Sequence, residues 1–124
     1  MLGSSDLVAF VATSDLDRAR AFYGEVLGLT VVEESPFACV FDAHGTQLRV
    51  TPVGEIRTAP YTVLGWVVDD IAAMVQALVH EGVRFERFVQ MEQDDLGVWA
   101  APSGARVAWF ADPDGNVLSL TQAS

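Results

Sequence analysis

Apolar residues follow two rhythms along this chain of 124 residues, one typical of helices and one typical of strands. The chain opens with an apolar run at 7–13 that lacks helical spacing, so we expect a strand there. Ser14 and Asp15 are then suited to begin a helix, and Gly28 is suited to end it with a positive φ. The apolar positions between them recur at helical spacing: Leu16, Ala19, Phe22, Tyr23, Val26 and Leu27.

Three further strands are predicted after this helix, at 29–34, 37–42 and 46–51. Ser35-Pro36 separates the first two, and a turn at 43–45 separates the second from the third. The segment 53–60 then combines proline, glycine and two charged residues, which is typical of a linker between two folded parts.

The second half begins with a predicted strand at 61–68 and a helix that starts at Asp69-Asp70 and ends at Gly82. The helix has one apolar stripe: Ile71, Met74, Val75, Leu78 and Val79. Apolar and polar residues then alternate over 83–89, although Phe88 and Val89 blur the pattern. An acidic loop, a short extended piece and a final hairpin follow, at 91–96, 98–101, 105–110 and 116–122.

The final hairpin contains the clearest turn in the chain, Asp112-Pro113-Asp114-Gly115. Proline presets φ at the first central position, the aspartates can bond the local backbone, and Gly115 supplies a positive φ. The strand after the turn alternates, so Leu118 and Leu120 are expected to face a core. The opposite face is expected to carry Val117, Ser119 and Thr121.

The two halves carry the same landmarks in the same order, which favours an internal duplication. Asp15 and Asp70 open the two helices, and Gly28 and Gly82 end them. Each half has too little structure to bury both faces of its own sheet. We therefore expect one α+β domain over 1–124, in which modules at about 6–52 and 61–123 share a curved, mostly antiparallel sheet around a cleft, with helices outside.

The formal net charge is −10, from seven basic and 17 acidic residues. This balance argues against binding to nucleic acid or to an anionic membrane. No signal peptide and no membrane-spanning run are visible, so neither is expected. The single cysteine, Cys39, excludes a disulfide framework within the chain and is expected to be a small buried apolar residue, which suits a reducing cytoplasm.

The chain resembles the vicinal oxygen chelate superfamily, which includes glyoxalase I, extradiol dioxygenases, and fosfomycin and bleomycin resistance proteins. The resemblance covers about 7–122 and is carried by three segments: SDLDRARAFY at 14–23, VLGL at 26–29 and WFADPDGNVL at 109–118. It implies paired βαβββ modules that form a bowl. It implies no single activity, since members of very different chemistry share the final motif.

In the metal enzymes of that superfamily, each module supplies a His or Gln from its first strand and a Glu from its last. Carried over by motif offset, these positions hold Val8 and Arg49 in the first module, and Val63 and Ser119 in the second. Two aliphatic side chains, a cation and a neutral hydroxyl are poor ligands for a divalent metal. We therefore expect no metal and no cofactor, and we expect His44 and His80 to lie on the surface.

Strand alternation suggests which side chains line the cleft. Arg49 either faces the cleft or lies at its rim, and Trp99 is the best candidate among the tryptophans for an aromatic that faces a ligand. Apolar walls with a few polar groups suit a small organic ligand. The expected lining is Val8, Phe10, Gln47, Arg49, Thr51, Val63, Trp99, Val117, Ser119 and Thr121.

Three functions remain open. The first is a binding protein without metal that sequesters a small organic molecule, as in the bleomycin resistance branch. The second is an enzyme such as a lyase or isomerase, either independent of metal or with relocated ligands, in which Arg49 stabilises a negative charge. The third is a regulatory module without catalysis. The resemblance also implies a homodimer.

Overall fold

The computed structural model describes residues 1–124 and divides them into two compact units, Met1–Arg57 and Thr58–Ser124. The division falls inside the segment 53–60, where the sequence predicts a linker. That the two units act as one domain stays a prediction. None of the helices combines the length and the apolar character needed to cross a membrane.

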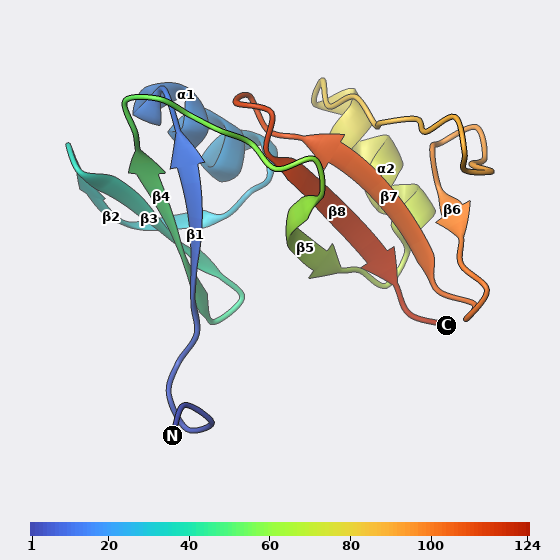
Figure 1. The fold of residues 1–124 in the computed structure, drawn as a ribbon, viewed down its shortest axis with the longest axis horizontal. Helices are drawn as coiled ribbons and strands as arrows, with labels where there is room; N and C mark the ends of the chain where they lie inside the picture. The colour runs from blue at the N-terminus through green and yellow to red at the C-terminus, as the bar shows by residue number, and fades with distance from the viewer. The chain divides into compact units, whose positions relative to one another are not determined.

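The first unit contains a four-stranded sheet in the order β1-β4-β3-β2 (Figure 1). β1 runs parallel to β4, and the other neighbours are antiparallel. The strands are β1 (Val8–Thr13), β2 (Thr30–Ser35), β3 (Ala38–Ala43) and β4 (Thr46–Pro52).

The helix of the first unit changes its winding partway. It begins as α1 (Leu16–Ala21), where the Asp15 side chain accepts a hydrogen bond from the Arg18 N–H at 3.1 Å. It continues as the π-helix η1 (Phe22–Val26), where the Leu27 N–H bonds the Phe22 carbonyl five residues back. The predicted helix is thus confirmed in position but not as one continuous α-helix. Gly28, with φ +78°, ends it as predicted.

The core of the first unit lies between this helix and one face of the sheet. Tyr23 is fully buried, and its ring lies 6.0 Å from that of Phe41. Leu48 and Val50 of β4 are buried beside them, whereas Arg49 between them is only half-buried. The strand predicted at 46–51 is therefore present, and its side chains alternate with the apolar side turned to the core.

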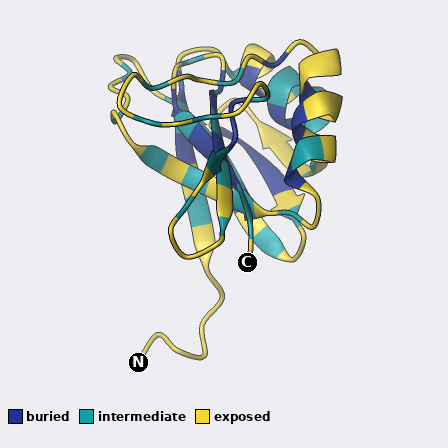
Figure 2. Cartoon of the chain, turned by 90° about the vertical axis from the view of Figure 1, so that its right-hand side faces the viewer, coloured by how far each residue is buried: buried dark blue, intermediate teal, exposed yellow.

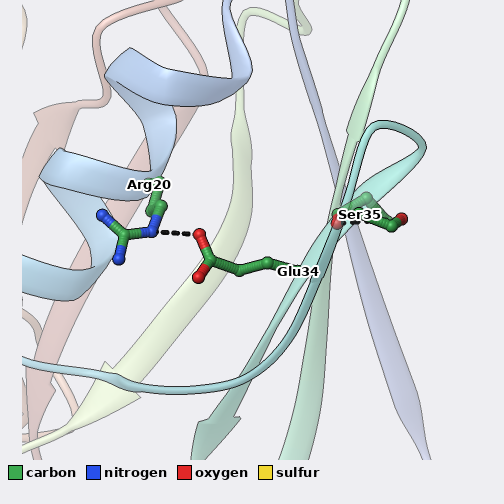
Figure 3. Close-up of polar contacts among 4 residues, drawn as sticks. Arg20, Glu34 and Ser35 are labelled. Atoms are coloured by element: carbon green, nitrogen blue, oxygen red, sulfur yellow. Dashed lines mark hydrogen bonds and ion pairs between the residues drawn. The ribbon is translucent and has the colours of Figure 1, made fainter.

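An ion pair on the surface joins the helix to the outer strand. Figure 3 shows the Arg20 side chain of α1 and the Glu34 side chain of β2 pointing toward one another. The two side chains are 45% and 50% exposed, so solvent screens the attraction. Such a pair contributes about 0–1 kcal/mol, and the buried apolar contacts remain the main source of stability for this unit.

The second unit repeats the strand order of the first, as β5-β8-β7-β6. β5 runs parallel to β8, and the other pairs are antiparallel. The strands are β5 (Thr62–Val67), β6 (Trp99–Ala100), β7 (Arg106–Ala111) and β8 (Val117–Gln122). In both units the first strand pairs with the last, which confirms the α+β class with two βαβββ modules.

One predicted extended segment is not a strand. Residues 83–89 contribute only an isolated bridge between Phe85 and Phe110, and β6 is only two residues long. The physical reason lies in the side chains of the connecting loop. Arg87, Gln93 and Asp94 bond the loop's own backbone and satisfy groups that would otherwise pair with a neighbouring strand.

The helix α2 (Ile71–His80) packs against β7 and β8. Its first turn is closed by Asp70, whose carboxylate accepts from the Ala73 N–H at 3.0 Å. Ile71 also donates its N–H to the Gln122 side chain at 2.9 Å. Figure 2 shows the buried side of this helix turned toward the sheet and its outer side exposed. The predicted helix and its glycine end at Gly82, φ +97°, are confirmed.

The turn before β8 is a closed hydrogen-bonded unit. The Asp112 carboxylate accepts from the N–H groups of Asp114 and Asn116, and also from the Asn116 side-chain amide at 2.8 Å. Asp112 is 5% exposed and Gly115 has φ +92°. The predicted tight turn is present, and the paired side chains lie inside the unit rather than in solvent.

Candidate functional site

The sheet of the second unit has one face against α2 and one face turned away from it. Leu118 and Leu120 are buried on the α2 side. The intervening residue Ser119 pairs across the sheet with Gly65 on one side and Trp109 on the other. Because side chains alternate along a strand, Ser119 and Trp109 lie on the face away from α2.

A hollow of about 270 Å³ lies in the second unit. Trp109 of β7 and Val117 of β8 contribute to it from the sheet, Tyr61 from the segment before β5, and Phe88 and Met91 from the loop before β6. Pro60, Thr62 and Gln90 complete the lining. The lining contains no Asp, Glu, Lys, Arg or His. It is therefore an aromatic and apolar recess, with the Thr62 hydroxyl and the Gln90 amide as its polar side chains.

The rings around Trp109 form a connected aromatic group. Phe88 meets Trp109 edge to face, with centroids 5.4 Å apart and planes at 89°. Trp99 lies on the same sheet face, 6.2 Å from Trp109 and tilted by 38°. Aromatic pairs in such geometries contribute about 0.5–1.5 kcal/mol beyond their buried area. Both partners hold Trp109 in place, while Tyr61 at 67% exposure leaves the recess open to solvent.

Of the lining residues predicted for the second unit, only Val117 belongs to this recess. Val117 lines it, and Trp99 contacts Trp109 rather than lining it directly. Ser119 is the cross-strand partner of Trp109 but is 7% exposed, so its hydroxyl offers little surface. Thr121 pairs with Val107 farther along β8. Val63 is 41% exposed and falls at an irregularity in the β5–β8 register.

The sequence-based residues of the first unit also share one sheet face. Val8 pairs with Gln47, and Phe10 pairs with Arg49, on the parallel strands β1 and β4. Thr51 continues the row beside Ala12. This face is opposite to that of Leu48 and Val50, and Phe10 is 65% exposed on it. This face therefore carries an exposed aromatic residue, Phe10, on the strand next to that of Arg49.

Only Val117 of the eight lining residues was proposed from the sequence. The other seven were not: Pro60, Tyr61, Thr62, Phe88, Gln90, Met91 and Trp109. Trp109 could have been found from alternation, because it falls opposite Ser119 in the final hairpin. Phe88 and Met91 carried no such signal. They lie in a loop whose path is set by side-chain hydrogen bonds, and periodicity gives no information about such a path.

The positions that the resemblance assigns to metal ligands do not suit a divalent cation. Val8 and Val63 have no donor atom, Arg49 is a cation, and the Ser119 hydroxyl is neutral and buried. His44 and His80 are both exposed, as expected. The structure also brings together no group of three or more His, Cys, Asp or Glu side chains that could hold a metal ion.

Comparison with solved structures finds the same fold in proteins that are named for different functions. A glyoxalase family protein from Bacillus anthracis is 20% identical, with a TM-score of 0.76 over 98% of this chain and 96% of that one. A lactoylglutathione lyase from Agrobacterium tumefaciens is 19% identical, with a TM-score of 0.75 over 98% and 96%. TnmS3, an antibiotic binding protein from Streptomyces sp. CB03234, is 27% identical, with a TM-score of 0.72 over 100% and 99%.

No curated protein matches the sequence. The family model of the Glyoxalase/Bleomycin resistance protein/Dioxygenase superfamily matches residues 6–120, which is nearly the whole chain. The matched region includes both βαβββ modules and the final turn, so it agrees with the fold observed in each unit. The chain therefore belongs to the glyoxalase, bleomycin resistance protein and dioxygenase superfamily.

Proposed function

We propose that this protein binds a small, flat, uncharged aromatic molecule in the recess around Trp109. The observation that carries the proposal is the composition of the recess: three aromatic side chains and a methionine surround about 270 Å³, with no charged side chain in the lining. An apolar hollow with a few polar groups is the usual form of a site for a small organic ligand.

The chemistry of the lining favours a ring system as ligand. Trp109 and Tyr61 offer extended apolar surfaces, and Phe88 already fixes the Trp109 ring by an edge-to-face contact. A ligand ring that stacks on the indole would gain about 25 cal/mol for each Å² of apolar area removed from water. Thr62 and Gln90 supply hydrogen bonds that orient the ligand in the recess.

The likeness to TnmS3 supports binding without transformation, because that protein is named as an antibiotic binding protein. The likeness to a lactoylglutathione lyase supports the same fold, but it gives no support for the reaction of that enzyme in this protein. The side chains at Val8, Arg49, Val63 and Ser119 supply no ligand set for a metal, so we propose that binding needs no divalent cation.

The test is titration with N-phenyl-1-naphthylamine, an uncharged probe with a flat naphthalene ring system, whose emission rises and shifts to the blue in apolar sites. We expect saturable binding that EDTA does not change. Trp109→Leu should weaken it about tenfold or more, since stacking and apolar area are both lost. The matched control is Trp66→Leu, at a half-buried tryptophan on the opposite face of the sheet.

Absence of saturable binding, or equal loss in both tryptophan variants, would contradict the site. A second set of titrations, with anionic aromatic compounds, tests the alternative that the protein is an enzyme. If a small carboxylate binds and is chemically converted, and Arg49→Ala abolishes only that binding, the protein is an enzyme that uses the Phe10 and Arg49 face.

The proposal also includes a homodimer in the cytoplasm. The homodimer rests on the resemblance to the superfamily, and the compartment on the single buried cysteine. Sedimentation equilibrium should give twice the 13.4 kDa chain mass for a dimer. A concentration-independent monomer would contradict it without affecting the recess, which lies within one unit.

A further inference from the structure

The loop at 86–98 is braced by its own side chains. It leaves the sheet at Glu86, whose N–H donates to the Trp109 carbonyl at 2.8 Å, and it returns at β6. Between these points it has no helix or strand of its own. Phe88 and Met91, which line the recess, are both carried by this loop. In Figure 1 the loop is the long connection between α2 and β6.

The Gln93 side chain makes three hydrogen bonds to the backbone of this loop. Its Oε1 accepts from the Phe88 N–H at 2.8 Å. Its Nε2 donates to the Glu86 carbonyl at 3.0 Å and to the Gly97 carbonyl at 2.8 Å. The amide therefore ties the start, middle and end of the loop together, and the identities of its partners fix which atom is oxygen and which is nitrogen.

Two neighbours tighten the same loop. Arg87 donates to the carbonyls of Asp94 and Asp95, at 2.7 and 2.6 Å. The Asp94 carboxylate accepts from the N–H groups of Leu96 and Val98, both at 2.9 Å. Gly97 turns the chain at φ +87°.

We propose that Gln93 is a positioning residue that holds Phe88 edge-on against Trp109 and so sets the shape of the recess before any ligand arrives. The expected effect of Gln93 on ligand binding rests on the proposed function. The bond from Phe88 N to Gln93 Oε1 acts directly on the residue that supports Trp109. A wall already ordered in the free protein lowers the entropy cost of ordering it on binding.

Gln93→Leu removes all three bonds at nearly unchanged volume. Gln93→Glu keeps the acceptor for Phe88 but loses both donors. Gln76→Leu, on the exposed side of α2, is the matched control. We expect the dissociation constant for N-phenyl-1-naphthylamine to rise about tenfold in Gln93→Leu and by less in Gln93→Glu, with no change in the control.

Two ligand-free measurements separate positioning from general stability. Amide exchange at Phe88 should accelerate about tenfold or more in Gln93→Leu while exchange in β7 and β8 is unchanged. The near-ultraviolet circular dichroism from the rings around Trp109 should also decrease. If Gln93→Leu does not fold, Gln93→Glu decides, through a decrease in the near-ultraviolet circular dichroism from the rings around Trp109 and a rise in the dissociation constant for N-phenyl-1-naphthylamine.

Unchanged Phe88 exchange together with unchanged probe affinity would overturn the inference. If the wild-type protein does not bind the probe, the proposed function fails, yet Phe88 exchange still decides whether Gln93 holds the loop. If the probe binds and Trp109→Leu weakens it while Gln93→Leu does not, the site stands and the positioning role of Gln93 is wrong.

Discussion

Gly65 and Ser119 are direct cross-strand partners on β5 and β8, and they lie so close that a methyl group on Gly65 would stand 2.8 Å from the Ser119 hydroxyl oxygen. Real Cβ atoms do not tolerate that distance. The sheet therefore requires glycine at this position because of the side chain that faces it, and not because of backbone strain. Ser119 is also the position to which the resemblance assigns the carboxylate of the superfamily's metal enzymes.

Gly65→Ala should accordingly lower the free energy of unfolding by about 1–3 kcal/mol, the usual cost of adding volume to a packed site. Ser119→Ala should remove most of that cost, because it deletes the oxygen that the new methyl group meets. Urea unfolding of the two single variants and the double variant measures this coupling. If the two changes in unfolding free energy simply add in the double variant, the contact with the Ser119 hydroxyl is not the reason for glycine at position 65.

The buried turn before β8 gives a second stability prediction. Asp112→Ala removes acceptors for the backbone N–H groups of Asp114 and Asn116 and for the Asn116 side chain. Since Asn116 is only 7% exposed, water replaces these bonds poorly. We expect a loss of about 2–4 kcal/mol in thermal or urea unfolding.

Asp112→Asn tests the cause, because it keeps an oxygen for the backbone groups but turns an amide toward the Asn116 amide. It should cost less than Asp112→Ala. An equal or larger loss in Asp112→Asn would show that the bond to the Asn116 side chain, rather than the bonds to the backbone N–H groups, holds the turn.

Two adjacent aspartates allow a matched test of helix capping at α2. Asp70 accepts from the Ala73 N–H, whereas Asp69 precedes the cap and is exposed. Asp70→Ala should cost about 1 kcal/mol of unfolding free energy, the typical loss for an N-cap. Asp69→Ala should change it by less than about 0.5 kcal/mol. Equal effects in the two variants would contradict the capping role.

Cys39 gives a prediction on pH. Burial raises the pKa of its thiol above the ordinary value of 9.0, the negative charge of Glu34 adds to the rise, and Arg20 opposes it. Between pH 9 and the raised pKa, the folded protein therefore keeps the thiol proton of Cys39 while the unfolded chain loses it. The resulting stability is present below pH 9 and is lost as pH rises from there through the raised pKa.

Unfolding free energy should therefore fall above pH 9 in the wild type, and fall less steeply in Cys39→Ala. All seven basic residues are arginines, so no lysine titrates in this range. The thiol should also react slowly with a disulfide reagent at pH 8 until the protein unfolds. Rapid reaction of the folded protein would contradict the burial that raises this pKa.

The sequence alone determined the elements whose signals are local. Asp70 opens a helix because its side chain bonds the next turn, and Gly115 takes a positive φ because it has no Cβ. The alternation around Leu118 identifies the buried face of β8, since side-chain direction repeats every two residues. These local rules, repeated in both halves, predicted the order of the helices and strands. The βαβββ modules and the superfamily followed from the resemblance of the segments at 14–23, 26–29 and 109–118.

Only the tertiary structure decided the recess. Residues 83–89 alternate like a strand, but Gln93 and Arg87 bond the loop's backbone and leave only one bridge there. This path brings Phe88 to Trp109, which lies 21 positions later in the chain. Periodicity reports the direction of a side chain within one element. It does not report which distant side chain satisfies a backbone group, and here that choice shapes the recess.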